Sequence, residues 1–423
     1  MQTTLRNLLA SAALLLPAAA LAGGYAVPNT NARDLSLAGS AVAGQKDATA
    51  AYVNPAALSG LEGLSVVANG TMIDFRSTWS ATDGNSARES NLKPAWPPSL
   101  FASYGGRSNG IGWGVGAGFN IPFGGNVFWP GDWPGRFSII TVNRRTYGMY
   151  LTGGVQPLPQ IKLGGGLIYY RTTEELSQAF NFLGQEGGAA LGTSGGKVSF
   201  DLSAEITPLV GVPLTIGIDY KHKADQTLTG HAHFDNAPPS LGPNTLDQGV
   251  THDLTIPNLL NVGIAYRVLP NLLLTGAWTF DRFIVYKRDL FAGDLGTTVL
   301  VNRDYKNGHT FRIGGEMEDV LPKLTVRAGV LRDISPTRPE ALSPTIPDSN
   351  STAVALGLGY QISPGLTVNA TYFHAFLDST NTVGAEVFQG KFETRANIYT
   401  VGIAWRPGDK PRGDSAGLSG KSF

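Results

Sequence analysis

Residues whose types could support catalysis or metal binding are few in this chain. It contains six His and no Cys, so disulfides, thiolate metal sites and Cys nucleophiles are excluded. His231 and His233 have the i, i+2 spacing of some strand metal sites, but no third ligand stands at a matching spacing. A hydrolase would need Ser or Asp in register with a His, whereas His222 and His374 lie on the apolar faces of predicted strands. We therefore expect no metal site, no cofactor and no enzymatic activity.

The segment from residue 119 to residue 137 concentrates large apolar side chains. They are Phe119, Ile121, Phe123, Val127, Phe128, Trp129, Trp133 and Phe137. A segment exposed to water rarely carries so much apolar surface without using it, so one interpretation is a capture groove for an apolar ligand. The other is a loop that packs against itself or lies at lipid headgroups. Arg136 either pairs with a ligand carboxylate through two parallel hydrogen bonds or holds the loop to a neighbour.

Composition narrows the class of protein that must position these residues. Of 423 residues, 54 are Gly and 15% are charged, which is Gly-rich and charge-poor and excludes a disordered or coiled-coil chain. The 32 Lys and Arg residues balance the 32 Asp and Glu residues, so the chain lacks the positive charge of a nucleic-acid-binding protein. No apolar run after residue 22 reaches the length of a membrane-spanning helix.

The first 22 residues have the pattern of a secretory signal peptide. Arg6 precedes an apolar stretch at residues 8–21, and a small-x-small cleavage site ends at residue 22. The alternative, a membrane anchor, is disfavoured because the stretch is short and contains Pro17. We expect residues 1–22 to be removed on export to the periplasm.

Most of the mature chain alternates apolar and polar residues with the period of two that is typical of β-strands. From Val198 to Thr207, Val, Phe, Leu, Ala and Ile alternate with Ser, Asp, Ser, Glu and Thr. A soluble sandwich has the same period, but here short Pro- and Gly-bearing turns alternate with long polar segments, as in transmembrane barrels. The short turns are 105–110, 157–160, 208–213, 269–271, 321–323 and 363–365, and the long segments are 76–95, 122–137, 172–196, 224–251, 289–308, 333–351 and 377–394.

These connections predict an all-β membrane protein, an antiparallel transmembrane β-barrel of about fourteen strands over residues 64–406, with both ends in the periplasm. Residues 23–63 alternate too little to join the wall. We expect them to fold as a small N-terminal hatch inside the wide lumen, the alternative being a loose periplasmic tail. Residues 407–423 are expected to form a polar C-terminal tail. Charges at inward positions fit an ordinary polar lumen, and among them Arg312 and Arg327 are candidate partners for a ligand head group.

Three stretches resemble the FadL/TodX (OMPP1) family of outer-membrane transporters of long-chain fatty acids and other hydrophobic compounds. They are residues 23–63, with the segments 32–41 and 54–58; residues 120–124 followed by 133–137; and residues 326–330, 346–349 and 357–360. The resemblance implies a fourteen-stranded barrel plugged by an N-terminal hatch. It also implies ligand capture at an extracellular apolar groove, transfer to a lumenal site and lateral exit through a gap at a kinked third strand. The polar residues that follow Pro407 depart from the family, whose members commonly finish on the last strand.

Two features are candidates for the gate that such a route requires. Pro55 fixes its own φ and restricts the preceding residue, so Asn54, Pro55 and Ala56 are expected to form a rigid turn in the hatch. Gly116 and Gly118 belong to a Gly-rich third strand that can bend away from its neighbour. The alternative makes Asn54 a helix cap and the glycines packing positions against the hatch.

The expected function is passive uptake of hydrophobic small molecules across the outer membrane of a Gram-negative bacterium, with long-chain fatty acids as the first candidate. A channel for monoaromatic hydrocarbons or alkanes is the first alternative, and a structural or adhesive barrel is the second. Ligand-binding candidates are Phe119, Ile121, Phe123, Phe128, Trp129, Trp133, Arg136, Phe137, Arg312 and Arg327. Expected partners are the ligand and the lipid and lipopolysaccharide of the outer membrane, without nucleic acid, and the barrel is expected to be monomeric.

Overall fold

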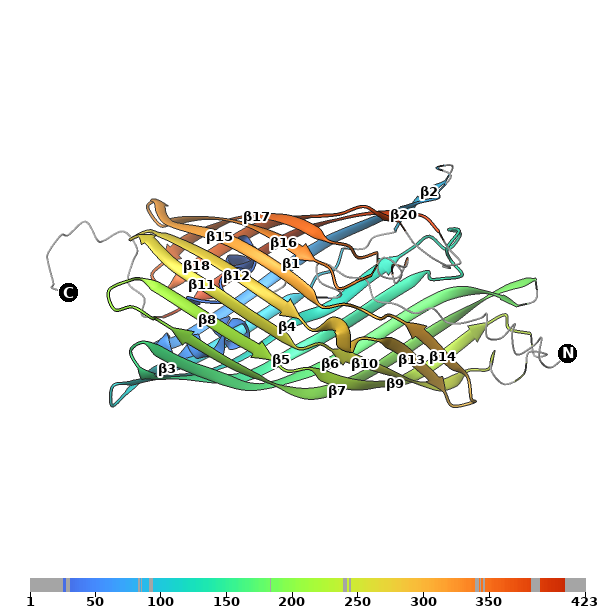
Figure 1. Cartoon of the computed structure of the whole chain (residues 1–423), viewed down its shortest axis with the longest axis horizontal. Helices are drawn as coiled ribbons and strands as arrows, with labels where there is room; N and C mark the ends of the chain where they lie inside the picture. The colour runs from blue at the N-terminus through green and yellow to red at the C-terminus, as the bar shows by residue number, and fades with distance from the viewer. Residues whose placement is uncertain are drawn as a thin grey trace.

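The computed structural model describes residues 26–407 except 28–30, 83, 85, 91–93, 183, 239–241, 243–244, 339–341, 343, 345–346 and 382–388. The predicted signal peptide and all but the first residue of the predicted C-terminal tail lie outside the described residues. Figure 1 shows a long barrel of tilted strands with the first helices inside it. In the part of the chain described, no helix is long and apolar enough to cross a membrane.

The wall is a closed antiparallel barrel of fourteen strands, which confirms the predicted fold. In order around the ring the strands are β1 (Gly63–Ser80), β3 (Pro98–Ser108), β4 (Ile111–Phe128), β5 (Thr141–Leu158), β6 (Ile161–Phe182), β7 (Gln185–Ile206), β8 (Leu214–Lys221), β11 (Leu259–Leu269), β12 (Leu272–Asp281), β15 (Gly308–Leu321), β16 (Leu324–Ile334), β17 (Ser351–Ser363), β18 (Leu366–Leu377) and β20 (Lys391–Trp405). β20 pairs with β1 and closes the ring. Closure leaves no sheet edge exposed to lipid, where unpaired backbone groups would each cost several kcal/mol.

The alternation along β17 shows which face meets lipid. Val354, Leu356 and Leu358 are 41%, 61% and 52% exposed, whereas Ala353 and Ala355 are buried. A soluble sandwich would bury its large apolar side chains. Here the large apolar side chains point outwards and the small ones inwards, as expected of a wall surrounded by lipid.

The short connections are the tight turns predicted from their Pro and Gly residues. Between β3 and β4, Asn109 and Gly110 have φ angles of 50° and 81°, which suit the two-residue turn of a β-hairpin. Between β17 and β18, Gly365 follows Pro364 with a φ of 74°. These turns place consecutive strands side by side at one end of the barrel.

The long connections differ from the prediction because strands continue beyond the ring. β6 and β7 pair until Phe182↔Gln185, so residues 172–196 form a hairpin rather than a loop. Further strands and a 3₁₀ turn in this outer half are β2 (Ala87–Glu89), β9 (Ala224–Asp235), β10 (Gln248–Ile256), η4 (Phe283–Val285), β13 (Arg288–Gly293), β14 (Thr298–Asn302) and β19 (Thr380–Asn381). Their outward faces meet water instead of lipid, so the apolar half of the alternation is lost while the backbone pairing persists.

Residues 31–61 fold inside the barrel as α2 (Ala32–Ser36), α3 (Ala50–Val53) and η1 (Pro55–Gly60). Asn31 caps the N-terminus of α2, because its side-chain oxygen accepts a hydrogen bond from the Asp34 backbone N–H at 2.6 Å. α2 contacts β16, β17 and β18, whereas η1 contacts β4, β5 and β6 on the opposite side of the ring. The segment therefore crosses the lumen as a hatch, and a loose tail does not describe residues 31–61.

Candidate functional site

An irregularity interrupts β4, the third strand of the ring. Its pairing with β5 steps from Asn120↔Gly148 to Phe123↔Thr146, so one extra residue on β4 forms a bulge. On the other side, the pairing of β4 with β3 ends at Phe119↔Leu100. Beyond this point the described strands pair with β4 on the β5 side only.

The start of the described chain lies against this bulge. The Val27 backbone N–H donates to the Pro122 carbonyl oxygen at 2.8 Å, and Ala26 forms an isolated antiparallel bridge with Phe123. The bulge is thus held by a segment that belongs neither to the ring nor to the hatch helices.

A cavity of about 150 Å³ lies on the lumenal side of the bulge. Pro122 and Phe123 contribute to its lining. Its apolar lining also includes Leu35, Val42, Tyr52, Val53, Leu331 and Phe373, from the hatch and the wall. An apolar molecule in this cavity would touch the hatch and the irregular strand at once.

Arg312 lines this cavity together with the acidic residues Asp34 and Asp281. Its Nη1 donates to Thr279 Oγ1, and within the described part of the chain it forms no ion pair. Lys221, which also lines the cavity, is neutralised by Asp201 and Asp219 at 2.9 and 2.7 Å. The Arg312 guanidinium therefore has donors available to an anionic group.

Arg327, the other predicted head-group partner, takes part in an ion-pair network instead. Its Nε donates to Glu316 Oε2 at 2.7 Å, and its Nη1 donates to Asn369 Oδ1 at 2.9 Å. Glu316 also pairs with Arg33 and Lys46 of the hatch, each at 2.7 Å. Arg327 does not line the cavity, and its contacts tie the hatch to β15 and β16.

Asn54, Pro55 and Ala56 form the rigid turn predicted from Pro55. The Asn54 side chain caps η1, accepting from the Ala56 N–H at 3.2 Å and donating to the Val42 carbonyl oxygen at 3.0 Å. The Ala56 N–H also donates to Ser203 Oγ of β7 at 2.9 Å. The turn packs on the inner faces of β5, β6 and β7, whereas the register shift lies in β4.

Gly116 and Gly118 pair regularly with both neighbouring strands, so the bend in β4 lies beyond them. A Cβ at Gly116 would lie 2.8 Å from Ala51 Cβ of the hatch. A Cβ at Gly118 would lie 2.2 Å from the ring of Phe101. Both glycines permit close packing, Gly116 against the hatch and Gly118 against β3.

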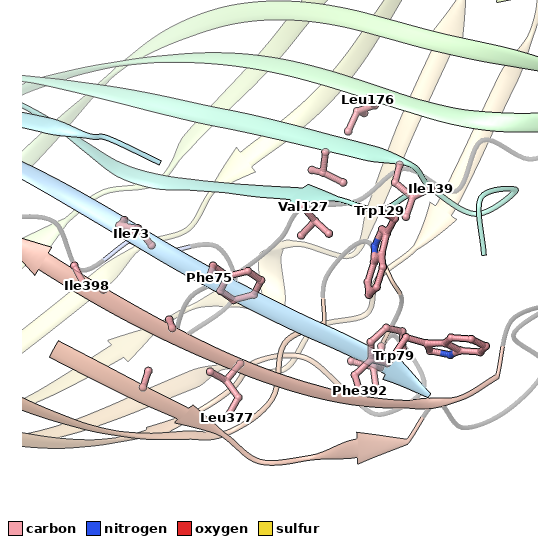
Figure 2. Packing of buried hydrophobic residues seen from close by; sticks show 14 of the residues in the cluster. Ile73, Phe75, Trp79, Val127, Trp129, Ile139, Leu176, Leu377, Phe392 and Ile398 are labelled. Carbon is pink, nitrogen blue, oxygen red and sulfur yellow. The ribbon is translucent and has the colours of Figure 1, made fainter. Parts of the chain in front are cut away.

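Trp129 and Trp133 stack at the outer end of the lumen, with ring centroids 4.2 Å apart and planes 11° from parallel. Trp79 of β1 meets Trp133 edge-on, and Phe392 of β20 meets Trp129 edge-on. The indole N–H of Trp129 donates to the Pro344 carbonyl oxygen at 3.0 Å. Figure 2 shows this cluster between strands from distant parts of the sequence. We call it the outer aromatic cluster.

The outer aromatic cluster continues inwards to the cavity. One connected set of buried apolar side chains contains Val127 and Trp129 at its outer end and Leu35, Leu331 and Phe373 at its inner end. The last three line the cavity. A continuous set of buried apolar side chains, which we call the apolar path, therefore links the outer end of the barrel to the cavity beside the bulge.

Three predicted apolar site residues on β4 have different surroundings. Phe119 lies on the same, outward face of β4 as the exposed Val115. Its ring stacks on that of Tyr147, with centroids 6.0 Å apart. Ile121 is buried within the bulge. Phe128 is half-buried at the end of the strand.

Arg136 and Phe137 lie at the outer surface. Nε and Nη2 of Arg136 donate to the two carboxylate oxygens of Glu186, each at 2.9 Å. The same guanidinium lies 4.4 Å from the ring centre of Phe137, which is 40% exposed. Arg136 thereby holds its loop to the tip of the β6–β7 hairpin.

A buried ionic cluster in the outer half was missed by the sequence analysis. The His252 ring nitrogens lie 2.9 Å from a Glu174 oxygen and 3.2 Å from an Asp289 oxygen. Arg144 pairs with Glu174, and Arg303 pairs with Asp289 at 2.8 Å. These groups come from β5, β6, β10, β13 and a loop, so no short sequence spacing could have revealed them. Among the described residues, no group of three His, Asp or Glu side chains is arranged to hold a metal ion.

The closed wall, the hatch and the apolar path define a class of protein, an outer-membrane transport barrel. The family model described as "Outer membrane protein transport protein (OMPP1/FadL/TodX)" matches residues 13–406, and the chain belongs to this family. It is therefore an outer-membrane protein of a Gram-negative bacterium that transports hydrophobic compounds.

Solved structures show the same fold. A Pseudomonas aeruginosa FadL homologue is 20% identical, with 90% of this chain and 99% of that chain covered and a TM-score of 0.81. The P. putida toluene transporter TodX is 15% identical, with 89% and 98% covered and a TM-score of 0.74. The Ralstonia pickettii toluene transporter TbuX is 14% identical, with 90% and 100% covered and a TM-score of 0.68. Among curated proteins, no match was found.

Proposed function

We propose that this barrel takes up long-chain fatty acids passively. The observation that supports the proposal is the buried apolar path from Trp129 to the cavity beside Phe123. An apolar ligand gains about 25 cal/mol for each Å² of its surface that leaves water. Because the same gain drives partition into the membrane, uptake needs no cofactor or external energy.

The proposed route ends at the β4 bulge. Pro122 and Phe123 belong to the bulge and also line the cavity, so a ligand there touches the wall where β4 has lost its β3 partner. Lateral exit into lipid requires displacement of the segment at Ala26 and Val27. That segment is attached to the bulge by the hydrogen bond to Pro122.

The choice of a fatty acid rests on Arg312. A guanidinium binds a carboxylate through charge-assisted hydrogen bonds, and this one lines the cavity, beside Asp34 and Asp281, without forming an ion pair among the described residues. A hydrocarbon ligand would leave those donors unsatisfied, which costs free energy in a buried site.

A monoaromatic hydrocarbon is the alternative ligand, and the size of the cavity favours it. A volume of about 150 Å³ is comparable to that of an engineered protein cavity that binds benzene. Two of the solved structures with this fold are described as toluene transporters. A long acyl chain would have to extend from the cavity along the apolar path.

The two ligand classes are separated by competition against a fluorescent acyl probe on the purified barrel. We expect a long-chain fatty acid to displace the probe and toluene to leave it bound. Arg312→Gln should weaken fatty-acid binding about tenfold or more, because the variant loses one charge-assisted hydrogen bond to the ligand carboxylate. Arg107→Gln, which removes an exposed cation paired with Glu62, is the control. Displacement by toluene alone would establish the hydrocarbon alternative.

The structural or adhesive alternative makes a different prediction in cells. Deletion of the gene should abolish uptake of the ligand if the barrel is a transporter. Unchanged uptake together with lost attachment to a surface would favour the adhesive barrel.

A further inference from the structure

The outer face of β12 and β15 marks the outer boundary of the membrane. Trp278 pairs with Phe311, and Phe280 pairs with His309, across the two strands. The Trp278 and His309 rings are stacked with centroids 6.0 Å apart. Aromatic girdles of this kind lie at the membrane–water interfaces of barrels. Ten residues of β12, Leu272–Asp281, also match the length that a tilted strand needs to cross a bilayer.

The chain breaks out of the strand directly beyond this girdle. Phe283 of η4 and Tyr286, which follows the turn, are buried, whereas Ile284 between them is 46% exposed. Tyr286 packs edge-on against Tyr305 with centroids 5.3 Å apart, which holds the turn in place. Figure 1 shows η4 on the near face of the barrel, between β12 and β13. An apolar side chain is therefore fixed on the outer surface at the level of the lipid headgroups.

Cations surround this turn. Arg282, Lys287 and Arg288 are exposed, and none of them takes part in an ion pair within the described chain. Arg288 is on the opposite face of β13 from Asp289, which points into the lumen toward His252, so Arg288 points outwards. Lys306 on the adjacent loop is exposed as well.

Two of these cations, Lys287 and Arg288, border an open depression of about 450 Å³. Lys287, Arg288 and Asn302 line it together with Val285, and Asp304 is its one acidic lining residue. Elsewhere on the outer surface, the exposed Arg332 and Lys391 lie 2.7 and 2.6 Å from Asp378 and Glu393. Among the described residues, the cations around η4 form no such ion pairs, so their charge is available to an external anion.

We propose that the surface formed by Arg282, Ile284, Lys287, Arg288 and Asn302 binds a phosphorylated glycolipid of the outer leaflet. Lipopolysaccharide carries phosphates on its lipid A sugars, at the border between headgroups and acyl chains. Arg and Lys bind phosphate oxygens through charge-assisted hydrogen bonds. The acyl chains would cover Ile284 and the girdle at Trp278 and Phe311, which gives one lipid both a polar and an apolar attachment.

Native mass spectrometry of the full chain in detergent, titrated with diphosphoryl lipid A, tests this site. The triple variant Arg282→Gln, Lys287→Gln, Arg288→Gln should bind lipid A at least about tenfold more weakly, since each cation near a lipid surface contributes roughly 1 kcal/mol. Arg332→Gln is the matched control, because it removes an exposed cation at the same side of the barrel that is already paired, and it should bind as the wild type does. Dephosphorylated lipid A should bind the wild type as weakly as lipid A binds the triple variant.

Equal binding of lipid A by the triple variant and the wild type would overturn the proposal. So would equal affinity of the wild type for phosphatidylglycerol, or displacement of lipid A by the same concentration of inorganic phosphate, because each would reduce the site to a general anion surface. Heat-modifiable migration on gels checks that each variant is folded. If the triple variant fails this check, the single variant Arg288→Gln replaces it, and its affinity for lipid A is expected to fall about fivefold.

Discussion

Arg33 of the hatch and Glu316 of β15 form a two-bond ion pair inside the barrel, although 283 residues separate them in sequence. Nε and Nη2 of Arg33 donate to the two carboxylate oxygens at 2.7 and 3.1 Å. Burial opposes the charge on Arg33, but the attraction of Glu316 outweighs it, so the pKa of Arg33 lies above its ordinary value. The hatch is therefore held to the wall by a buried charge pair.

Glu316→Gln should loosen the hatch. The substitution leaves Arg33 and Arg327 buried without their shared anion, and breaking a buried pair in this way costs about 3–5 kcal/mol. We expect a lower unfolding temperature and faster proteolysis of the hatch segment in the purified protein. Glu62→Gln removes an exposed partner of Arg107 and should cost less than about 1 kcal/mol. Equal stability of the two variants would contradict this role of Glu316.

The ionic cluster around His252 should make the outer half of the barrel sensitive to alkaline pH. Burial lowers the pKa of His252, but the charge of Glu174 and the hydrogen bond to Asp289 together raise it to about 9. Because the folded pKa is raised, the stabilisation is fully present below the unfolded value of about 6.5 and is lost as the pH rises through about 9. Thermal unfolding and proteolysis of the outer hairpins, measured from pH 6 to pH 10, should show this loss. In His252→Gln the profile should be flatter in this window, and parallel profiles for the two proteins would refute the assignment.

The outer aromatic cluster should contribute to ligand capture. Phe128→Ala together with Trp129→Ala should weaken capture of the acyl probe, since each ring contributes about 1.5–3 kcal/mol when a ligand covers it. The closed barrel should survive, as judged by heat-modifiable migration. Phe376→Ala removes an outward ring that is 55% exposed and should leave capture unchanged. Unaltered affinity in the double variant would make the cluster a packing element of the loops.

Bulky residues at Gly116 or Gly118 should block uptake while leaving capture at the outer loops intact. Val at Gly116 would collide with Ala51 of the hatch, and Val at Gly118 would collide with Phe101. Gly70→Val on β1 is the matched control, because nothing lies within 4 Å of a Cβ built there. A crosslink that closes the gap beside β4 should have the same effect on uptake. Normal transport by the crosslinked variant would mean that the ligand passes into the periplasm instead.

The ring itself could be predicted from the sequence because every wall strand must turn its large apolar side chains outwards, towards lipid. In β17 the large residues Val354, Leu356 and Leu358 all face outwards, and the turn at Pro364 and Gly365 reverses the chain. Beyond the membrane this rule ends. Residues 172–196 pair as a hairpin, yet their outward side chains meet water and show no apolar alternation, so they were predicted as a loop.

The candidate site was only partly predictable for a related reason. The sequence indicates Phe123 as a candidate aromatic residue and Arg312 as a candidate lumenal cation, and both line one cavity in the structure. Arg327, like Arg312, is an arginine on the inner face of the wall, but it pairs with Glu316. Alternation along a strand gives the face of the wall on which a side chain lies, whereas its partner depends on the register between strands, which places Glu316 directly opposite Arg327.

Pairing of the first wall strand with the last fixes the order in which the molecule is assembled. β1 pairs with β20 from Val66↔Trp405 to Ser80↔Lys391, so the ring cannot shut before the final strand has been delivered. The hatch precedes β1 in the chain and contacts wall strands on opposite sides of the closed ring. It must therefore be enclosed while the sheet is still open, and the Arg33 to Glu316 contact can form before closure. A nascent chain that stops short of Lys391 would keep two unpaired edges and an uncovered hatch, which makes it a substrate for periplasmic proteolysis.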